Sequence, residues 1–238
     1  MLHLSLITLP RESLKWRFLK PYELHQILWK GFGNLERGEQ KKRFLYRHNE
    51  LNDVHSVLVQ SVTEPDWSFL ANEADGSIVQ MKSFNPLAIS GEKPLRFMLR
   101  ANPVVTRKYP DGTKRRIAVG SDRKRLQKIL NVESLSDLPS RELMLMNWLQ
   151  KCGEKKGFAI ASASNGSREQ MLCEVGPNRD IILRKHDQKS TKDRITITSV
   201  DFTGMLKVTD VQKFATAMQA GIGRARSFGC GLLSVAIG

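Results

Sequence analysis

The sequence predicts an α+β fold made of two tandem ferredoxin-like (RRM-like) domains with antiparallel sheets. Its 238 residues are enough for one large domain or two small ones. The predicted elements run β-α-β-β-α-β twice along the chain, which is the element order of this fold. A break that contains two prolines and one glycine, 85–94, separates the two runs. We therefore expect one domain over residues 1–90 and a second over residues 91–238.

The first domain is expected to contain one clear helix and one eroded helix. Pro21 suits the first position of a helix, because its fixed φ matches and the N–H that it lacks would be unpaired there. The apolar spacing continues this helix to about Phe32. The segment 64–70 can form only a short or degenerate helix. Strands are expected at 2–9, 44–50, 54–61 and 77–84.

The second domain opens with a strand, 95–103, whose side chains alternate between two faces. Its apolar face carries Leu95, Phe97 and Leu99. The opposite face carries Arg96, Met98 and Arg100. We expect the two arginines of this strand to face a polyanionic partner.

Two helices and four strands complete the second domain. Ser140 is placed to cap a helix at 140–153, and Gly153 is expected just beyond its end. Asp210 is placed to cap a helix at 211–221. Strands are expected around 157–164, 171–184, 194–208 and 231–238.

Composition excludes several classes of protein. A chain with 40% hydrophobic and 26% charged residues is ordinary for a globular protein, which excludes wholesale disorder. The three cysteines form no Cys-x-x-Cys pair, which argues against a disulfide scaffold or a zinc ribbon and fits a reducing cytoplasm. No apolar run approaches the roughly 18 residues of a membrane span. The first residues also lack the basic region of a signal peptide.

The formal net charge of +14 indicates a polyanionic partner, either nucleic acid or an anionic membrane. Half of this charge lies between Arg107 and Lys128, where nine basic residues accompany two aspartates. The Tyr-Pro-Asp-Gly sequence at 109–112 predicts a turn. We therefore expect a basic hairpin with arms around 104–108 and 114–119, followed by a basic helical stretch.

We interpret this basic arm, 107–128, as a device that grips phosphates. The alternatives are a solvated basic surface and a membrane-facing patch. The arm lacks the Trp/Phe/Leu stripe of an interfacial helix, which favours nucleic acid over a membrane. Its candidate phosphate contacts are Arg107, Lys114, Arg115, Arg116 and Arg123.

The helix that begins at Pro21 carries a candidate acid/base pair. Its core stripe contains Leu24 and Leu28, and His25 lies about 100° from Leu24 on the flank of that stripe. Tyr22 is the neighbour of His25 at i, i+3 spacing. A half-buried imidazole beside a phenol is a candidate for proton transfer. Taken alone, a histidine in such a position is more often a packed or hydrogen-bonded residue.

Two further histidines, His48 and His55, flank the predicted hairpin of the first domain and could face each other. No carboxylate or thiolate spacing supports a metal site there. We therefore predict no metal ligands in this chain.

A glycine-rich segment, 221–231, lies close to the C-terminus. It contains Gly221, Gly223, Arg224, Arg226, Gly229 and Gly231. Glycines let a backbone approach a ligand and present N–H groups to phosphate, and arginines add charge-assisted hydrogen bonds. A dinucleotide fingerprint would instead follow the first strand of a βαβ unit. We therefore predict a phosphate contact and no small-molecule cofactor.

Several segments resemble one family of RNA-processing proteins. They are the Tyr-x-Leu-His-Gln element at 22–26, the FMLRANP run at 97–103, the Gly-apolar-Gly clusters at 221–223 and 229–231, and the closing GCGLLSVA at 229–236. Together they resemble the CasE/Cse3 family, the crRNA-processing endoribonucleases of type I-E Cascade. The resemblance spans essentially the whole chain.

The resemblance implies metal-independent cleavage of CRISPR repeat RNA at the 3′ base of its stem-loop. The 2′-hydroxyl upstream of the scissile bond would attack phosphorus, leaving a 2′,3′-cyclic phosphate and a 5′-hydroxyl. His25 carries over as the catalytic histidine, acting as base or acid, and Tyr22 as the tyrosine that orients ribose or phosphate. The strand arginines, the basic arm and the glycine-rich segment are then the expected RNA contacts. The expected partners are the crRNA stem-loop and other Cascade subunits.

Two other functions stay open at this point. An RNA-hairpin-binding module of the same fold would lack cleavage, and the intact Tyr22/His25 pair argues against it. A basic DNA-binding protein would be expected to carry a helix-turn-helix or zinc-finger pattern, and this sequence has neither.

Overall fold

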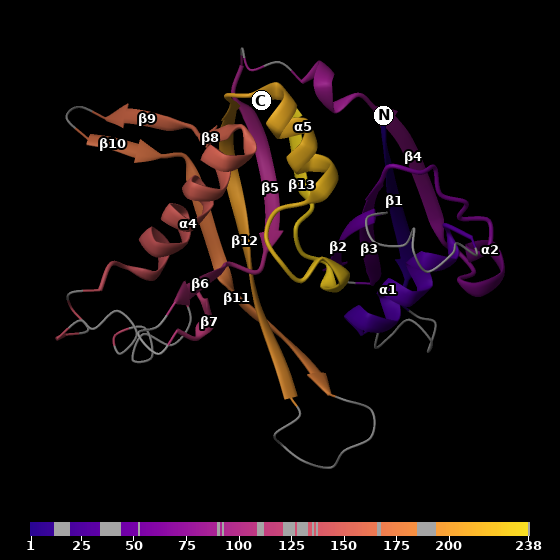
Figure 1. The fold of residues 1–238 in the computed structure, drawn as a ribbon. Coiled ribbons are helices and arrows are strands. Elements are labelled where there is room, and N and C mark those ends of the chain that lie inside the picture. Colours follow the sequence, from indigo (N-terminus) through magenta and orange to yellow (C-terminus); the bar gives the residue numbers. More distant parts are fainter. Residues whose placement is uncertain are drawn as a thin grey trace.

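The computed structural model contains two α+β units that lie side by side (Figure 1). It describes residues 1–11, 20–33, 44–51, 53–89, 91, 93–108, 112–120, 127, 133–134, 136, 138–165, 168–184 and 194–237. Among these residues, no helix is both long and apolar enough to cross a membrane.

The N-terminal unit is an antiparallel sheet in the order β2-β3-β1-β4. Its strands are β1 (Leu2–Pro10), β2 (Phe44–Leu51), β3 (Val54–Ser61) and β4 (Ile78–Phe84). Helix α1 (Pro21–Lys30) follows β1, and the single turn α2 (Leu70–Glu73) follows β3. The predicted eroded helix therefore exists, but it begins where the predicted segment 64–70 ends.

Helix α1 packs on one face of this sheet. Leu24 and Leu28 are buried in the core of the unit, as the helical spacing predicts. The helix ends at Gly31, where a Cβ would lie 2.5 Å from Cζ3 of Trp67. Glycine at this position lets the end of α1 approach the core, so the helix is held firmly against the sheet.

The C-terminal unit repeats the same topology. Its sheet has the order β11-β12-β5-β13, with β8 paired to β12, and its strand pairs are antiparallel. The strands of the main path are β5 (Leu95–Ala101), β11 (Cys173–Arg184), β12 (Arg194–Val208) and β13 (Leu233–Ile237). Helices α4 (Arg141–Lys156) and α5 (Val211–Ala220) cover one face. The predicted fold of two tandem ferredoxin-like units is confirmed.

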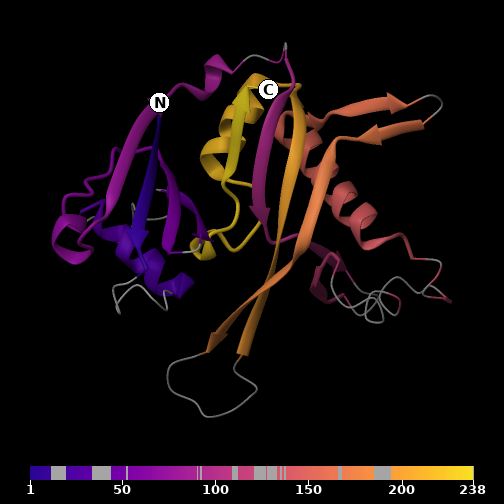
Figure 2. The ribbon, with the colours of Figure 1, turned by 180° about the vertical axis from the view of Figure 1, so that it is seen from behind.

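Short elements are inserted into this second unit. They are the hairpin β6 (Val104–Lys108) and β7 (Lys114–Ala118), the strand β8 (Phe158–Ile160), and the hairpin β9 (Ser162–Asn165) and β10 (Arg168–Met171). Two 3₁₀ turns, η2 (Pro86–Ala88) and η5 (Arg226–Phe228), lie in the connections. The long strands β11 and β12 extend beyond the rest of the fold in both views (Figures 1 and 2).

The end of α4 differs from the prediction. Ser140 caps its start, accepting a hydrogen bond from the Leu143 N–H at 3.1 Å, as predicted. Gly153, however, lies inside the helix against Phe158, and the helix ends at Gly157, whose φ is 77°. The left-handed backbone at the end of a helix favours glycine, and Gly157 provides it. The predicted end at Gly153 is therefore wrong.

The two units have separate cores, with η2 in the connection between them. Leu2 at the start of β1 packs into the core of the C-terminal unit, so the N-terminal strand contacts both. We propose that the domains extend over 1–90 and 91–238, as the sequence predicts.

Candidate active site and nucleic-acid interface

His25 lies on α1 in an aromatic environment. Its imidazole is near three rings, with centroid distances of 5.9 Å to Trp29, 5.4 Å to Phe44 and 6.1 Å to Tyr46. The residue is half-buried, and this burial lowers the pKa of His25 below its ordinary value of 6.5. Burial therefore favours the neutral imidazole, which can accept a proton.

Tyr22 lies one turn before His25 and is much more open. Its side chain is exposed, with a relative accessibility of 54%. The i, i+3 spacing on a helix places the two side chains on adjacent positions of the same surface. The predicted pair thus lies at the boundary between the core and the solvent, where a substrate can reach both groups.

The glycine-rich segment lies next to α1, although the sequence separates them by almost the whole chain. The turn η5 in the middle of this segment packs against α1 and β2. Its first glycine ends α5, and the Gly231 N–H donates to the Arg100 carbonyl oxygen of β5 at 2.7 Å. The fold therefore brings together the two candidate sites that sequence analysis identified at opposite ends of the chain (Figure 1).

All four predicted glycines of this segment have left-handed backbones, with φ between 79° and 93°. At Gly221 a Cβ would lie 2.9 Å from a methyl carbon of Leu45. The backbone conformation therefore favours glycine at all four positions, and packing adds a second reason at Gly221. The contact of these glycines with phosphate stays a prediction.

Arg224 and Arg226 are both exposed on this segment. A third basic residue, Lys156 in the last turn of α4, lies beside them, and its Nζ is 3.4 Å from the Gly221 carbonyl oxygen. Burial and the charge of Arg226 lower the pKa of Lys156. Sequence analysis missed Lys156, because its position in a separate helix gives no signal that it joins this cluster.

The predicted basic hairpin is present as β6–β7. Lys114 and Arg116 are exposed. The structure describes the backbone of Arg107 and Arg115, which pair directly across the hairpin, and Arg123 lies outside the described residues. Lys108 and Lys114 are both exposed and also pair directly, and like charges directly opposite each other destabilise a pair of strands. A polyanion would offset this repulsion.

The hairpin and α1 are on different sides of the C-terminal unit. Both views place β6–β7 beyond β11 and β12 as seen from α1 (Figures 1 and 2). Near the base of the hairpin, Asn102 forms a backbone bridge with Arg224. The glycine-rich segment therefore lies between the hairpin and the helix that carries His25.

The two arginines of β5 differ in their surroundings. Arg96 is exposed, as predicted. Arg100 is only 7% exposed, and its guanidinium contacts Asp201 of β12 together with the His48 carbonyl oxygen and the Asn49 side chain of β2. The expected open position of Arg100 is therefore not found, because the N-terminal unit covers this part of the sheet.

Arg100 and Asp201 belong to a charged network between the two units. Burial alone would raise the pKa of Asp201, but the hydrogen bonds and charge of Arg100 lower it below its ordinary value. Burial, with the charge of Arg100, lowers the pKa of Arg47 to about 10. Arg179 of β11 approaches the same carboxylate at 3.6 Å. This network connects β2 to the second sheet beside the candidate site.

His48 and His55 do face each other, with Nε2 of His48 2.9 Å from Nδ1 of His55. Contrary to the sequence analysis, a carboxylate accompanies them, since ligand atoms of these two residues and Glu50 lie within 4.8 Å of one another. Burial and His55 lower the pKa of His48 to about 4, which keeps its imidazole neutral. The imidazoles bond to each other and Glu50 pairs with Arg11 at 3.4 Å, so protein partners already engage this cluster.

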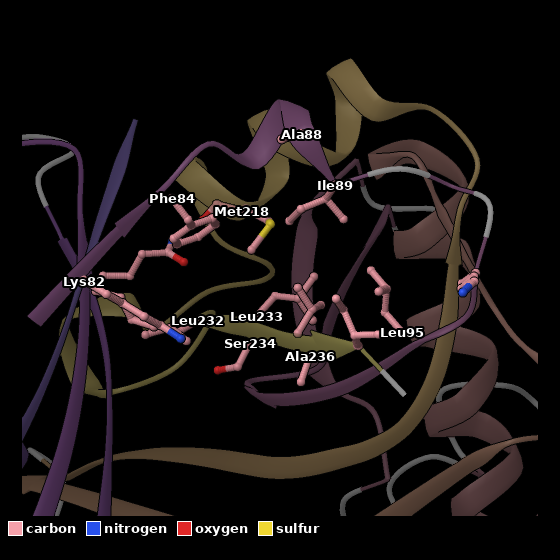
Figure 3. Close-up of a pocket in the computed structure, with 15 residues that line it drawn as sticks. Lys82, Phe84, Ala88, Ile89, Leu95, Met218, Leu232, Leu233, Ser234 and Ala236 are labelled. Carbon is pink, nitrogen blue, oxygen red and sulfur yellow. The ribbon is translucent and has the colours of Figure 1, made fainter.

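Within the described part of the chain, two cavities lie between the units. One of about 290 Å³ is lined by residues of α1, β2 and the glycine-rich segment, including Pro21, Tyr46 and Gly229, and borders the candidate site. The other, of about 600 Å³, is an apolar groove bordered by Phe84 and Met218 among others (Figure 3). It is lined by none of the predicted site residues, so it is separate from the candidate site.

Comparison with known proteins identifies the family. Residues 2–236 match the family described as CRISPR associated protein. The chain is 31% identical to the CRISPR-associated endoribonuclease Cse3 of Thermus thermophilus over 91% of this chain and 90% of the relative. It is 28% identical to the CRISPR system Cascade subunit CasE of Escherichia coli over 90% of this chain and 91% of that relative. A solved structure of Thermus thermophilus Cse3 bound to an RNA representing a pre-cleavage complex superposes with a TM-score of 0.71 at 26% identity, covering 99% of this chain and 98% of that one. The chain therefore belongs to the CRISPR-associated proteins of the CasE/Cse3 family.

Proposed function

We propose that this protein is a metal-independent endoribonuclease that binds the CRISPR repeat stem-loop and cleaves precursor crRNA at the 3′ base of the stem. The observation that carries this proposal is the packing of η5, which begins at the exposed Arg226, against α1, the helix that carries Tyr22 and His25. A proton-transfer group and a cation on two elements in contact fit cleavage of a phosphodiester. The relative named as an endoribonuclease supports the same activity.

In the proposed reaction, the 2′-oxygen forms a bond to phosphorus while the bond from phosphorus to the 5′-oxygen breaks. His25 accepts the proton of the 2′-hydroxyl, which its neutral imidazole permits. Tyr22 orients the ribose or phosphate, and the arginines offset the charge that develops on the phosphorane. The 5′-oxygen leaves as a hydroxyl after taking a proton from solvent. The products are a 2′,3′-cyclic phosphate and a 5′-hydroxyl.

The basic hairpin β6–β7 is the proposed grip on the RNA stem. Duplex RNA has a deep and narrow major groove, so a basic hairpin recognises its shape and phosphates rather than its bases. We propose that the protein retains the product stem-loop and joins other Cascade subunits, as the name of the Escherichia coli relative indicates. Three free cysteines fit a cytoplasmic location.

One experiment tests the reaction directly. The purified protein is incubated with the repeat RNA of its own host in EDTA, and the ends of the products are mapped. Cleavage at the 3′ base of the stem with a 2′,3′-cyclic phosphate supports the proposal. Tight binding without cleavage would instead favour a non-catalytic RNA-hairpin-binding module of the same fold.

The role of His25 has its own test in the pH dependence of single-turnover cleavage. A base must be unprotonated, so we expect the rate to rise with pH through the pKa of His25 and then level off. A rate that falls with rising pH through this range would assign His25 as the acid.

A further inference from the structure

Tyr46 of β2 contacts both halves of the candidate site from inside the protein. Its side chain is only 1% exposed. Its hydroxyl oxygen lies 2.9 Å from the carbonyl oxygen of Pro21, at the start of α1. The same oxygen lies 3.0 Å from the carbonyl oxygen of Ser227, in the glycine-rich segment. The hydroxyl has a single proton, so it donates one three-centre hydrogen bond that is shared between the two carbonyl oxygens. One buried hydroxyl thus bridges two segments that are far apart in the sequence.

On the helix side, Tyr46 restrains the backbone that holds His25. In the i→i+4 pattern of an α-helix, the Pro21 carbonyl accepts the N–H of His25 as well as the bond from Tyr46. The phenol ring of Tyr46 also stacks on the imidazole, with an interplanar angle of 30°. His25 is therefore fixed by Tyr46 through both its backbone and its ring.

On the loop side, the ring of Tyr46 supports the backbone near Gly229. A Cβ at Gly229 would lie 3.3 Å from Cε2 of Tyr46, so this part of the segment packs directly on the ring. Burial raises the pKa of Tyr46, which keeps the phenol protonated and able to donate. Arg226 immediately precedes Ser227, so the bond to the Ser227 carbonyl anchors the backbone beside a proposed phosphate contact.

We propose that Tyr46 is a positioning residue that sets His25 of α1 at a fixed distance from the arginine-bearing glycine-rich segment. This inference rests on the proposed function, because it assigns both groups to one RNA site. Tyr46 itself is buried and acts through His25 and the segment. A misplacement of about 1 Å can cost about a hundredfold in rate, so a single bridging hydroxyl has a measurable effect.

The test removes only the hydroxyl, in Tyr46→Phe. We expect single-turnover cleavage of the repeat hairpin to slow by at least about tenfold, while affinity for the hairpin stays within about twofold. The matched control is Ser5→Ala, which removes the buried hydrogen bond from Trp67 Nε1 to Ser5 Oγ in the same core. Ser5→Ala should lower the melting temperature similarly and leave the cleavage rate unchanged.

A second readout does not depend on activity. The NMR resonance of the His25 ring proton on Cε1 should shift in RNA-free Tyr46→Phe and stay in place in Ser5→Ala. If the wild-type protein does not cleave, the proposed function fails, while the resonance still tests the placement of His25. A folded Tyr46→Phe protein that cleaves at the wild-type rate and keeps the wild-type resonance overturns the role of Tyr46.

If Tyr46→Phe does not fold, Gly229→Ala is the second test, because it changes the contact between the glycine-rich segment and the same ring. Its methyl group would lie 3.3 Å from Cε2 of Tyr46, closer than an ordinary contact. We expect the His25 resonance to move in this variant too. An unmoved resonance would show that the ring does not transmit the position of the segment to His25, which contradicts the proposal.

Discussion

The guanidinium of Arg100 donates two hydrogen bonds to the carboxylate of Asp201, from Nε to Oδ1 at 2.7 Å and from Nη2 to Oδ2 at 2.9 Å. The same guanidinium donates to the His48 carbonyl oxygen and to Oδ1 of Asn49 on β2. A bidentate pair of this kind fixes orientation as well as distance. Arg100 therefore joins the two units, and we assign it a structural role rather than an RNA contact.

Arg100→Met tests this role. Removing Arg100 takes the bidentate partner from the buried Asp201 carboxylate and leaves it Arg179 at 3.6 Å. We therefore expect a loss in the free energy of unfolding of at most about 3–5 kcal/mol, the cost of leaving a buried charge without any partner. Urea denaturation measures this loss. If the Arg100→Met protein has wild-type stability but binds RNA more weakly and with a shallower dependence of affinity on salt, Arg100 contacts RNA and the structural assignment is wrong.

The lowered pKa of Asp201 predicts that the folded protein loses stability in acid. Its pKa is lower in the folded protein than in the unfolded chain, so its stabilising contribution is present above the unfolded pKa. That contribution is lost as the pH falls below the ordinary value of 3.8 and through the folded pKa. We expect the melting temperature to drop in this range. Asp201→Asn should start from a lower stability and show a weaker dependence on pH there.

His25→Ala should slow cleavage by about 10²–10⁴, the usual range for a general acid or base, while hairpin binding stays within a few-fold. Gln26→Ala is the matched control, because Gln26 is the exposed next residue on α1. Single-turnover rates and binding measured on the same preparations separate the two effects. Unchanged cleavage in His25→Ala contradicts the assignment, and loss of folding would favour a packing role for His25.

Much of the fold could be predicted because each strand and helix has its own periodicity. The sequence order correctly predicted both ferredoxin-like units, and the cap residues Ser140 and Asp210 marked helix starts. The burial of Arg100 could not be predicted, because alternation along a strand shows which residues share a face. It does not show what covers that face. Here β2 of the other unit covers it.

The site was predicted in parts rather than as a whole. Sequence spacing paired Tyr22 with His25 because they share a helix, and it grouped Arg224 with Arg226 because they share a loop. The contact between α1 and the turn η5 depends on how the two units pack, which no local pattern encodes. Tyr46 gave no signal for the same reason, since its hydroxyl bridges two backbone carbonyls from distant segments.

The basic hairpin predicts a salt-dependent contribution to RNA affinity. Lys114 and Arg116 are exposed on β7, and replacing both by Ala should weaken binding of the RNA stem-loop. The slope of log affinity against log salt should become shallower by roughly 0.7–0.9 for each phosphate that the protein no longer neutralises. The control Lys82→Ala/Lys207→Ala removes two exposed charges from other strands and should leave the slope unchanged. If RNA affinity falls while the salt slope stays the same, the protein hairpin β6–β7 has a structural role and does not contact phosphate.

In the glycine-rich segment, we expect glycine substitutions to lower stability and arginine substitutions to lower RNA affinity. Gly223 has a φ of 81°, and a Cβ there would meet its nearest neighbour, the Asn102 carbonyl oxygen, at an ordinary 3.5 Å. Gly223→Ala should therefore cost about 1–2 kcal/mol of stability through backbone strain.

Arg224→Ala/Arg226→Ala should keep the melting temperature and lose about 1.5–3 kcal/mol of RNA affinity for each charged hydrogen bond removed. Melting and binding measured on the same samples distinguish the two. Wild-type affinity and cleavage in the double arginine variant would show that the segment faces away from RNA, and the binding surface would then lie on Arg96 and the hairpin β6–β7.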